Sequence, residues 1–524
     1  MDTDSLCKMK GYYKEGIQSW EALVSVLVDE VCGKYLNDKD IANIKEMMIS
    51  KKFIPAGRYL YYAGRERNFY NNCYAFIAEE DTREEWGKIL DRVLSALMTG
   101  GGTGINLDVI RAKGSILKGT GGEASGPIAL MEIIDYMGTK VRQGGSRRSA
   151  LLASLSYWHP DIKEFMAIKD WDTETTKKKL ADYNYKAPMD CTNISVVYDK
   201  LEENDLSYDI FKENMRRALL DGEPGFIFNL KEKQRLEKGR NPCGELISSD
   251  DSDVCNLGSL NWANIKDIGD LERCTILALK FLMCGSKEAQ LPNQKIVDVR
   301  AKNNRIGMGI MGLHEWMLQR GHKYEVSEEL YLWLQRWQYT CDTEKTAIAD
   351  EIGCPVPLTT RGIAPTGTIS MLAKTTSGIE PIFAKAYKRR FLKNEVWKYT
   401  YTVDDTARRI IEERGSELGV QDAEEIDLED RLQVLDLLGE HTDMAISTTI
   451  NILEPVTDSN TILGMTRMVY NYAKRGNIRG LTFYPNGARG SILEECDYSE
   501  AIRSENVEFV EHDICAISGK GSCG

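Results

Sequence analysis

The chain has 524 residues, of which 42% are hydrophobic and 28% charged, and a net charge of −13 from 67 Lys and Arg against 80 Asp and Glu. This is the composition of a globular protein with a large core, and it excludes disordered, collagen-like and disulfide-knotted chains. The acidic balance argues against a broad surface for nucleic acid or anionic membrane, while leaving room for a local anion pocket. The length favours three or four domains or one large α/β barrel.

Thirteen cysteines are scattered along the chain. No run of about 18 apolar residues predicts a membrane span, and the acidic N-terminus lacks the apolar stretch of a secretion signal. We therefore expect a cytoplasmic protein whose thiols are reduced. This expectation directs attention to what each cysteine does.

Helical and extended patterns alternate along most of the chain. Apolar spacing predicts helix within residues 15–50 and 86–98, and a charged helical region over residues 404–440. Short apolar runs predict strands at 151–155, 195–198 and 226–229. This alternation indicates βα units and parallel strands, hence an α/β fold. The last thirty residues contain few large apolar groups and predict a mobile tail.

Several glycine-rich loops are candidate anion sites. They lie at residues 100–104, 119–126 and 143–148, and a further loop at 364–370 alternates hydroxyl residues with glycine. Exposed amides and hydroxyls suit phosphate oxygens, but loop flexibility or a helix cap explains each loop equally well. The G-x-G-x-x-A pattern at 119–124 lacks an evident preceding strand, so a dinucleotide fold has weak support, and no P-loop occurs.

The most informative stretch is Asn-Pro-Cys-Gly-Glu at residues 241–245. Proline and glycine around Cys243 predict a tight loop that projects the thiol, and Cys255 follows twelve residues later. A thiolate nucleophile needs a histidine base, and none of the five histidines is near in sequence. Neither C-x-x-C nor H-x-x-x-H spacing occurs, so we expect no metal site. A lone cysteine is usually packing, but the neighbouring amide, carboxylate and second thiol indicate chemistry.

Residues 241–245 together with 255–261 resemble the active-site segment of ribonucleotide reductase catalytic subunits. Further matches follow in the same order over residues ~50–490. They are 71–73, 99–107, 111–114, 143–149 with 158–162, 303–305 with 307–314, and 365–370 with 378–383.

The resemblance implies roles for seven residues. Cys243 would carry a thiyl radical that takes the 3′ hydrogen of the ribose, Glu245 would be the base on the 3′ hydroxyl, and Asn241 would bind the sugar hydroxyls. Cys73 and Cys255 would supply two electrons and become a disulfide. Cys515 and Cys523 would pass electrons from a thioredoxin- or glutaredoxin-like reductant through the tail.

The resemblance also implies two nucleotide sites. The ribonucleotide substrate would bind at Asn72, Gly102, Pro365, Thr366, Gly367, Thr368, Ile369 and Ser370. The specificity site for a dNTP effector would comprise Arg111, Lys113, Arg142, Gln143, Gly144, Gly145, Ser146, Arg147 and Arg148. Relatives often have a hydroxyl residue near position 58, where this chain has Arg58, which would substitute as a phosphate contact.

The radical source follows from the late part of the chain. The oxygen-dependent class passes a radical from a metal-containing subunit through two adjacent late tyrosines, whereas tyrosine pairs here occur only at 12–13 and 61–62. Residues 479–489 instead resemble the adenosylcobalamin-dependent class II, which implies adenosylcobalamin as the cofactor. The alternatives are a class I catalytic subunit and a nucleotide-binding regulatory protein on the same scaffold.

The implied fold is a ten-stranded α/β barrel made of two antiparallel halves, each of five parallel strands, over residues 51–490. Residues 1–50 would form a helical segment without the ATP-binding regulatory domain of many relatives, and 491–524 a redox tail. Little room exists between residues 85 and 240 for the insertion that completes the effector site in monomeric relatives. We therefore expect a homodimer that binds neither nucleic acid nor membrane.

Overall fold

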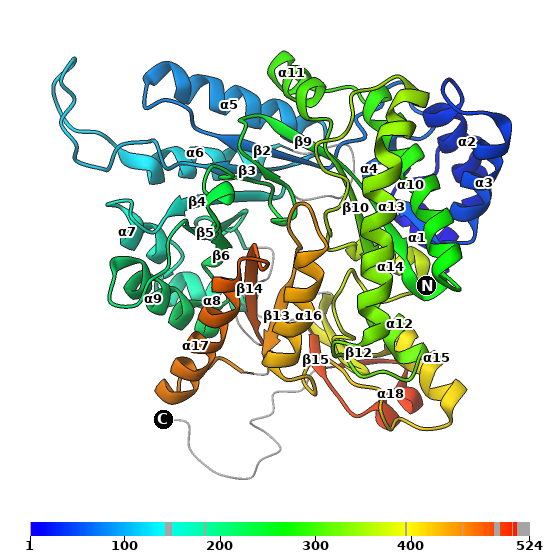
Figure 1. The fold of residues 1–524 in the computed structure, drawn as a ribbon. Helices are drawn as coiled ribbons and strands as arrows, with labels where there is room; N and C mark the ends of the chain where they lie inside the picture. Colours follow the sequence, from blue (N-terminus) through cyan, green and yellow to red (C-terminus); the bar gives the residue numbers. More distant parts are fainter. Residues whose placement is uncertain are drawn as a thin grey trace, which may run out of the picture.

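The computed structural model describes residues 2–141, 149–182, 185–393, 396–452, 454–486, 493–505 and 507–510. Strands lie at the centre of the molecule, and helices surround them on several sides (Figure 1). Among these residues, no helix is both long enough and apolar enough to cross a membrane.

Five parallel strands form one half of the central sheet. Each strand pairs with the next in chain order, and helices on the outside make most of the connections, as expected for right-handed βα units. The strands are β2 (Cys73–Ile77), β3 (Gly102–Asn106), β4 (Leu151–Ser156), β5 (Thr192–Tyr198) and β6 (Gly225–Phe228). The helices are α5 (Arg83–Met98), α6 (Gly126–Lys140), α7 (Ile162–Ala167), α8 (Thr173–Ala181) and α9 (Leu206–Asp221).

The second half is also parallel. Its strands are β9 (Asp253–Asn261), β10 (Ile306–Met311), residues 361–363, β13 (Thr449–Ile452) and β14 (Gly480–Pro485). Residues 361–363 lie between β10 and the segment that leads into β13. They are joined to β10 by one parallel bridge, Met308 to Arg361, and to that segment by another, Ile363 to Ile446. Its helices are α10 (Ile268–Glu288), α11 (Gln294–Asn303), α12 (Leu313–Gln319), α13 (Glu328–Ile352), α14 (Gly367–Ala373), α16 (Leu428–Glu440) and α17 (Ser459–Arg475).

Antiparallel pairs at both seams close the two halves into a barrel. Strand β6 pairs with β14 at one seam, and β2 pairs with β9 at the other. A short strand, β1 (Phe53–Pro55), extends the second seam along β9. Ten strand segments of the described chain thus form the barrel, which confirms the predicted architecture.

The loop that carries Cys243 lies between the two halves. It runs from β7 (Gly239–Arg240) to β8 (Ile247–Ser248). A side chain at Gly104 of β3 would overlap the Arg240 carbonyl oxygen, so the loop packs directly on the first half. On the other side, Ala445 N–H donates to the Glu245 carbonyl oxygen (3.0 Å), in the segment that leads to β13 of the second half.

Helices near the N-terminus pack on the second half of the barrel. They are α1 (Thr3–Met9), α2 (Trp20–Cys32), α3 (Asp38–Ile49) and α4 (Gly57–Tyr62). Residues 15–50, expected to be helical, form two helices because Gly33 ends α2 and the Asn37 side chain caps the N-terminus of α3. Helices α2 and α3 contact α10, and α1 contacts α14.

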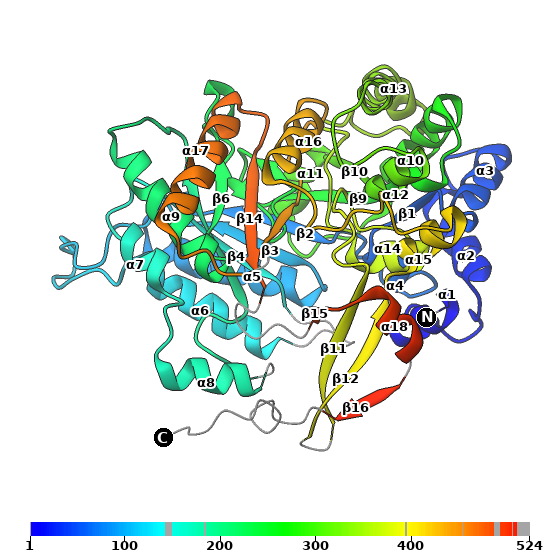
Figure 2. The ribbon, with the colours of Figure 1, turned by 90° about the horizontal axis from the view of Figure 1, so that it is seen from below.

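A separate four-stranded antiparallel sheet contains part of the expected tail. Its order is β15 (Leu493–Glu495), β11 (Ala386–Lys393), β12 (Val396–Val403) and β16 (Glu508–Val510), and Figure 2 shows it below the barrel. The sequence predicts that the last thirty residues, within the expected redox tail of 491–524, are mobile. Described residues 493–505 and 507–510 are instead folded, because helix α18 (Tyr498–Ser504) buries Tyr498 and Ala501 against this sheet and α15 (Asp405–Arg414).

Candidate active site

Cys243 projects from the tip of its loop, as the sequence predicts. Gly244 has a φ of +83°, a conformation that favours glycine and turns the chain sharply after the cysteine. The Cys243 side chain is exposed and lines two cavities, of about 370 Å³ and about 350 Å³. A molecule in either cavity can therefore reach the Cys243 side chain.

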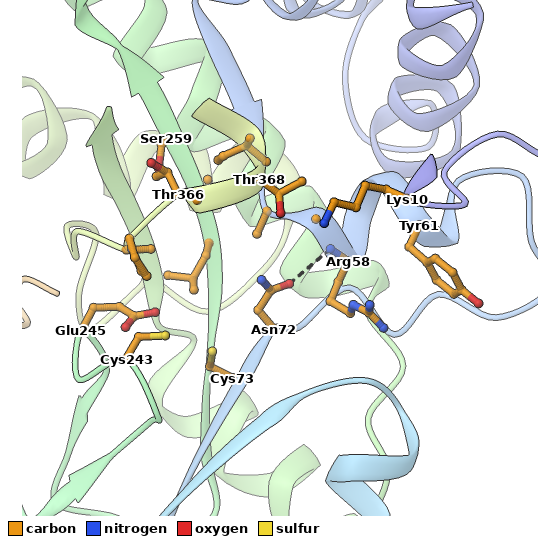
Figure 3. Close-up of a pocket in the computed structure, with 18 of the residues that line it drawn as sticks. Lys10, Arg58, Tyr61, Asn72, Cys73, Cys243, Glu245, Ser259, Thr366 and Thr368 are labelled. Carbon is orange, nitrogen blue, oxygen red and sulfur yellow. Dashed lines mark hydrogen bonds between the residues drawn. The ribbon is translucent and has the colours of Figure 1, made fainter. Parts of the chain in front are cut away.

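The first cavity contains candidate residues from several distant segments. Figure 3 shows Cys243, Glu245 and Cys73 together at one end, and Lys10 and Arg58 at the other. Leu257 and Ser259 of β9 also line this cavity.

Cys73 and Cys255 lie directly opposite each other across the β2–β9 seam. Directly opposed residues of antiparallel strands have Cα atoms about 4.5–5.5 Å apart, which is within the range of disulfide-bonded cysteines. Both side chains are buried in a small cluster inside the barrel, and Cys73 also lines the first cavity. Burial, followed by the nearby Glu245 charge, raises the pKa of Cys255 well above its usual value, so its resting state is the thiol.

Glu245 and Asn241 are almost completely buried beside the cysteine. The Leu246 N–H donates to Asn241 Oδ1 (2.9 Å). The Asn241 amide lies close enough to Glu245 to lower the pKa of its carboxyl, against the larger effect of burial, but Asn241 Nδ2 and Glu245 Oε2 make no well-formed hydrogen bond with a described residue. Unpartnered buried polar atoms are uncommon in folded proteins, and here they are suited to the hydroxyl groups of a ligand. Burial raises the pKa of Glu245 to about 7, which suits a group that accepts a proton near neutral pH.

Some hydroxyl groups of the loop at 364–370 form hydrogen bonds within the protein, and another lies at the cavity wall. Thr366 Oγ1 accepts a hydrogen bond from Gly378 N–H (2.7 Å), and Ser370 Oγ bonds to Ser377 Oγ (2.8 Å). Thr368 remains half-buried at the cavity wall. Of the substrate residues predicted here, Pro365, Thr366, Gly367, Thr368 and Ile369 line the cavity, whereas Ser370 is buried behind them.

The glycine cluster at 100–104 has a packing explanation. A side chain at Gly102 would bring its Cβ within 3.0 Å of Pro242, and one at Gly101 would overlap the Tyr74 ring. The cluster therefore makes room for the Cys243 loop, and Gly102 does not line the first cavity. Asn72, by contrast, lines the cavity and accepts the backbone N–H of Arg58 on Oδ1 (3.3 Å).

The two predicted effector residues within the described part of the chain line neither cavity. Arg111 pairs with Asp81, and Lys113 pairs with Glu164 (3.0 Å), in the segment between β3 and α6. The remaining members, Arg142, Gln143, Gly144, Gly145, Ser146, Arg147 and Arg148, lie outside the described residues, as do Cys515 and Cys523.

The second cavity is lined by strands of both halves, including β5, β6 and β14. Small and hydroxyl side chains cover much of its wall: Ser195, Gly222, Gly225, Gly244, Ser447, Thr448, Gly480 and Thr482. At the base of the Cys243 loop, Arg240 and Arg479 both donate to Asn229 Oδ1 (2.6 and 3.0 Å), and Arg479 pairs with Glu237 (2.7 Å). These bonds fix the root of the loop.

Sequence reasoning missed Lys10, Tyr12 and Ser259 as cavity residues. The signal for Ser259 was present, since every second residue of a strand faces the same side and Ser259 lies four residues after Cys255. No sequence pattern could indicate Lys10 and Tyr12, because their position at the cavity depends on how α1 packs against the rest of the protein. No group of three or more His, Cys, Asp or Glu residues among the described ones is arranged to hold a metal ion.

Comparisons with known proteins agree with this fold. The family model described as "Ribonucleotide reductase, barrel domain" matches residues 72–190, 192–336 and 359–484. The chain therefore belongs to the ribonucleotide reductase family, and it is an enzyme of that family.

Two relatives bear names that specify a cofactor. The chain is 26% identical to the vitamin B12-dependent ribonucleoside-diphosphate reductase of Mycobacterium tuberculosis, over 87% of this chain and 74% of that protein. It is also 26% identical to the enzyme of the same name from Thermoplasma acidophilum, over 91% and 69%. The Actinobacillus ureae class Id ribonucleotide reductase alpha subunit shares the fold, with a TM-score of 0.75 at 16% identity over 96% of this chain and 98% of that one.

Proposed function

We propose that this enzyme reduces ribonucleoside diphosphates to 2′-deoxyribonucleotides by thiyl-radical chemistry, using adenosylcobalamin. The observation that carries the proposal is the convergence of Cys243, Glu245 and Cys73 on one cavity, with Cys255 paired opposite Cys73. The choice of diphosphates rests on the names of the two relatives.

The chain's own residues account for each step of the reduction. The Cys243 sulfur, as a thiyl radical, takes the 3′ hydrogen, while Glu245 accepts the proton of the 3′ hydroxyl. A thiol of the Cys73–Cys255 pair protonates the 2′ hydroxyl, which leaves as water. The pair then supplies two electrons and a second proton to C2′ and becomes a disulfide. Cys243 returns the hydrogen to C3′ and Glu245 returns its proton to the 3′ oxygen, so both residues end in their starting states. One ribonucleotide and two thiols thus give one deoxyribonucleotide, one disulfide and one water.

The seam pair provides a direct test of this stoichiometry. In a single turnover without external reductant, we expect one deoxyribonucleotide per active site together with a disulfide between Cys73 and Cys255, because the two residues are in direct register. Peptide mapping by mass spectrometry without reduction identifies the pair. Cys274→Ser, which removes a buried thiol outside the cavities, should leave the yield unchanged. Product without this disulfide would contradict the assignment.

The second cavity is suited to the radical source. Its volume of about 350 Å³ accommodates a nucleoside-sized group, and its small side chains leave that group in contact with Cys243. Adenosylcobalamin supplies a carbon-centred radical when its cobalt–carbon bond breaks. Ser195, Ser447, Thr448 and Thr482 would hold the adenosyl group. Strand β14 has Phe483 beside Tyr484 and hence no tyrosine pair, which supports this class over the oxygen-dependent one.

The cofactor requirement separates the two classes. We expect the purified chain, given adenosylcobalamin, a small dithiol and a ribonucleoside diphosphate, to form deoxyribonucleotide without any second subunit. Hydroxocobalamin, which lacks the adenosyl group, is the matched control and should give none. The measurement is deoxyribonucleotide formation, followed by chromatography. Turnover that appears only with a metal-containing subunit would assign the chain to class I instead.

The proposed homodimer, the dNTP effector site and the electron relay involve residues other than those proposed for catalysis. Exposed apolar side chains on the neighbouring helices α5 and α6, among them Leu94, Ile133 and Tyr136, support a homodimer through this face. Arg111 and Lys113 lie in the segment that leads to α6, where a dNTP effector at such an interface would bind. Electrons would reach the seam disulfide from a thioredoxin- or glutaredoxin-like protein by way of Cys515 and Cys523.

A further inference from the structure

The charges of the first cavity are separated along its length. Among the described residues that line the cavity, Glu245 is the only carboxylate, and it lies at the Cys243 end. The two cations of this described lining are Lys10 and Arg58, and Figure 3 places both at the opposite end, beyond Asn72 and Thr368. A ligand with its uncharged part at Cys243 and an anionic part at the far end matches this distribution.

The Lys10 amino group has no hydrogen bond or ion pair with another described residue, although its side chain is half-buried. Most other lysines with partly buried side chains in this protein have carboxylate partners, such as Lys52 with Asp270 (2.6 Å) and Lys280 with Asp40 (2.7 Å). A partly buried ammonium group at a cavity wall is therefore available to a ligand.

The position of Lys10 is fixed from both sides. On one side, α1 packs on α14, where Thr3 Oγ1 donates to the Leu372 carbonyl oxygen (3.4 Å) and accepts from Lys51 Nζ (2.6 Å). On the other side, the Tyr12 hydroxyl packs so closely on Gly57 that a Cβ there would lie 2.8 Å away. Lys10 thus lies between the first turns of α4 and α14, both of which line the cavity.

We propose that Lys10 binds the phosphate groups of the substrate, so that residues near the N-terminus complete the active site. The inference rests on the proposed function for the identity of the ligand, a nucleoside diphosphate. Lys10 lies outside the segments matched by the family model, which begin at residue 72. An ammonium group forms charge-assisted hydrogen bonds with phosphate oxygens, and the half-buried Thr368 hydroxyl at the cavity wall is a neutral partner beside it.

The test compares a phosphorylated ligand with its unphosphorylated form. Equilibrium binding of a nucleoside diphosphate and of the parent nucleoside is measured by calorimetry for the wild type, Lys10→Ala, Lys10→Arg and Lys8→Ala. Lys8 lies on the same helix, is exposed and does not line the cavity, so its variant controls for the loss of one positive charge. We expect Lys10→Ala to weaken diphosphate binding about tenfold or more and to leave nucleoside binding unchanged. Arginine should restore most of the affinity.

Two outcomes would overturn the inference. Equal weakening of nucleoside and diphosphate binding would show that Lys10 only supports the structure, and equal diphosphate affinity in the wild type and Lys10→Ala would show no contact. The wild-type turnover assay with adenosylcobalamin is independent of these measurements. If that assay fails while the Lys10→Ala substitution still weakens diphosphate binding and leaves nucleoside binding unchanged, the reaction is wrong and the phosphate site stands.

Discussion

Replacing Cys243 by serine is expected to lower turnover by on the order of 10⁴-fold or more, equivalent to at least ~5 kcal/mol in activation free energy. A hydroxyl does not replace a thiol as a hydrogen-atom carrier, and no other described thiol lines both cavities. Nucleotide affinity should stay within a factor of about two, since the substitution removes no charge and little volume. The measurements are steady-state product formation and calorimetric binding of a ribonucleoside diphosphate.

A matched control uses a cysteine outside both cavities. Cys354→Ser changes a half-buried thiol beside α13 and should retain wild-type turnover. Substantial activity in Cys243→Ser, or an equal loss in Cys354→Ser, would show that Cys243 is not the atom through which hydrogen passes.

The second large effect concerns Glu245. Its buried carboxyl has a pKa of about 7, so the proton-accepting form becomes populated as the pH rises through that value. We expect kcat/KM of the wild type to increase from pH 6 to pH 8. Glu245→Gln should lower kcat by about 10²- to 10⁴-fold, the usual contribution of a general base, and should remove this rise.

Asp422 provides the control for burial without catalysis. Burial also raises its pKa, to about 6, but Asp422 lies near the four-stranded sheet and lines neither cavity. Asp422→Asn should keep both the rate and the rise with pH. If Glu245→Gln retained the rise, the titrating group would be another one.

Local patterns were sufficient to predict much of the barrel and of the site. The apolar runs at 151–155, 195–198 and 226–229 correspond to β4, β5 and β6 because strands buried on both faces have continuous apolar sequence. The turn at Cys243 followed from Pro242 and Gly244. The pairing of Cys73 with Cys255 could not be predicted from local patterns, because the register of two strands 182 residues apart depends on closure of the barrel. Only the family resemblance predicted it.

Other features depended on contacts that local sequence does not encode. Gly102 and Gly104 resembled part of an anion loop, but their role is to leave space for a loop more than 130 residues later in the chain. Lys10 reaches the cavity only because α1 docks on α14. Described residues 495–505 and 507–510 lack long apolar runs and were expected to be mobile, yet β15 pairs with β11 and β16 pairs with β12.

The position of Cys243 in the wall shared by two cavities has a consequence for how such an enzyme can diversify. In the proposed chemistry the oxidant and the nucleotide occupy different cavities, and Cys243 is the reactive side chain that lines both, with Pro365 as the other described residue they share. Substitutions around β14 would then exchange one radical source for another without disturbing sugar recognition. Substitutions near α1 and α14 would retune nucleotide recognition without exposing the radical source. The residues that bind the radical source and those that bind the nucleotide could therefore change independently, provided that Cys243 is kept.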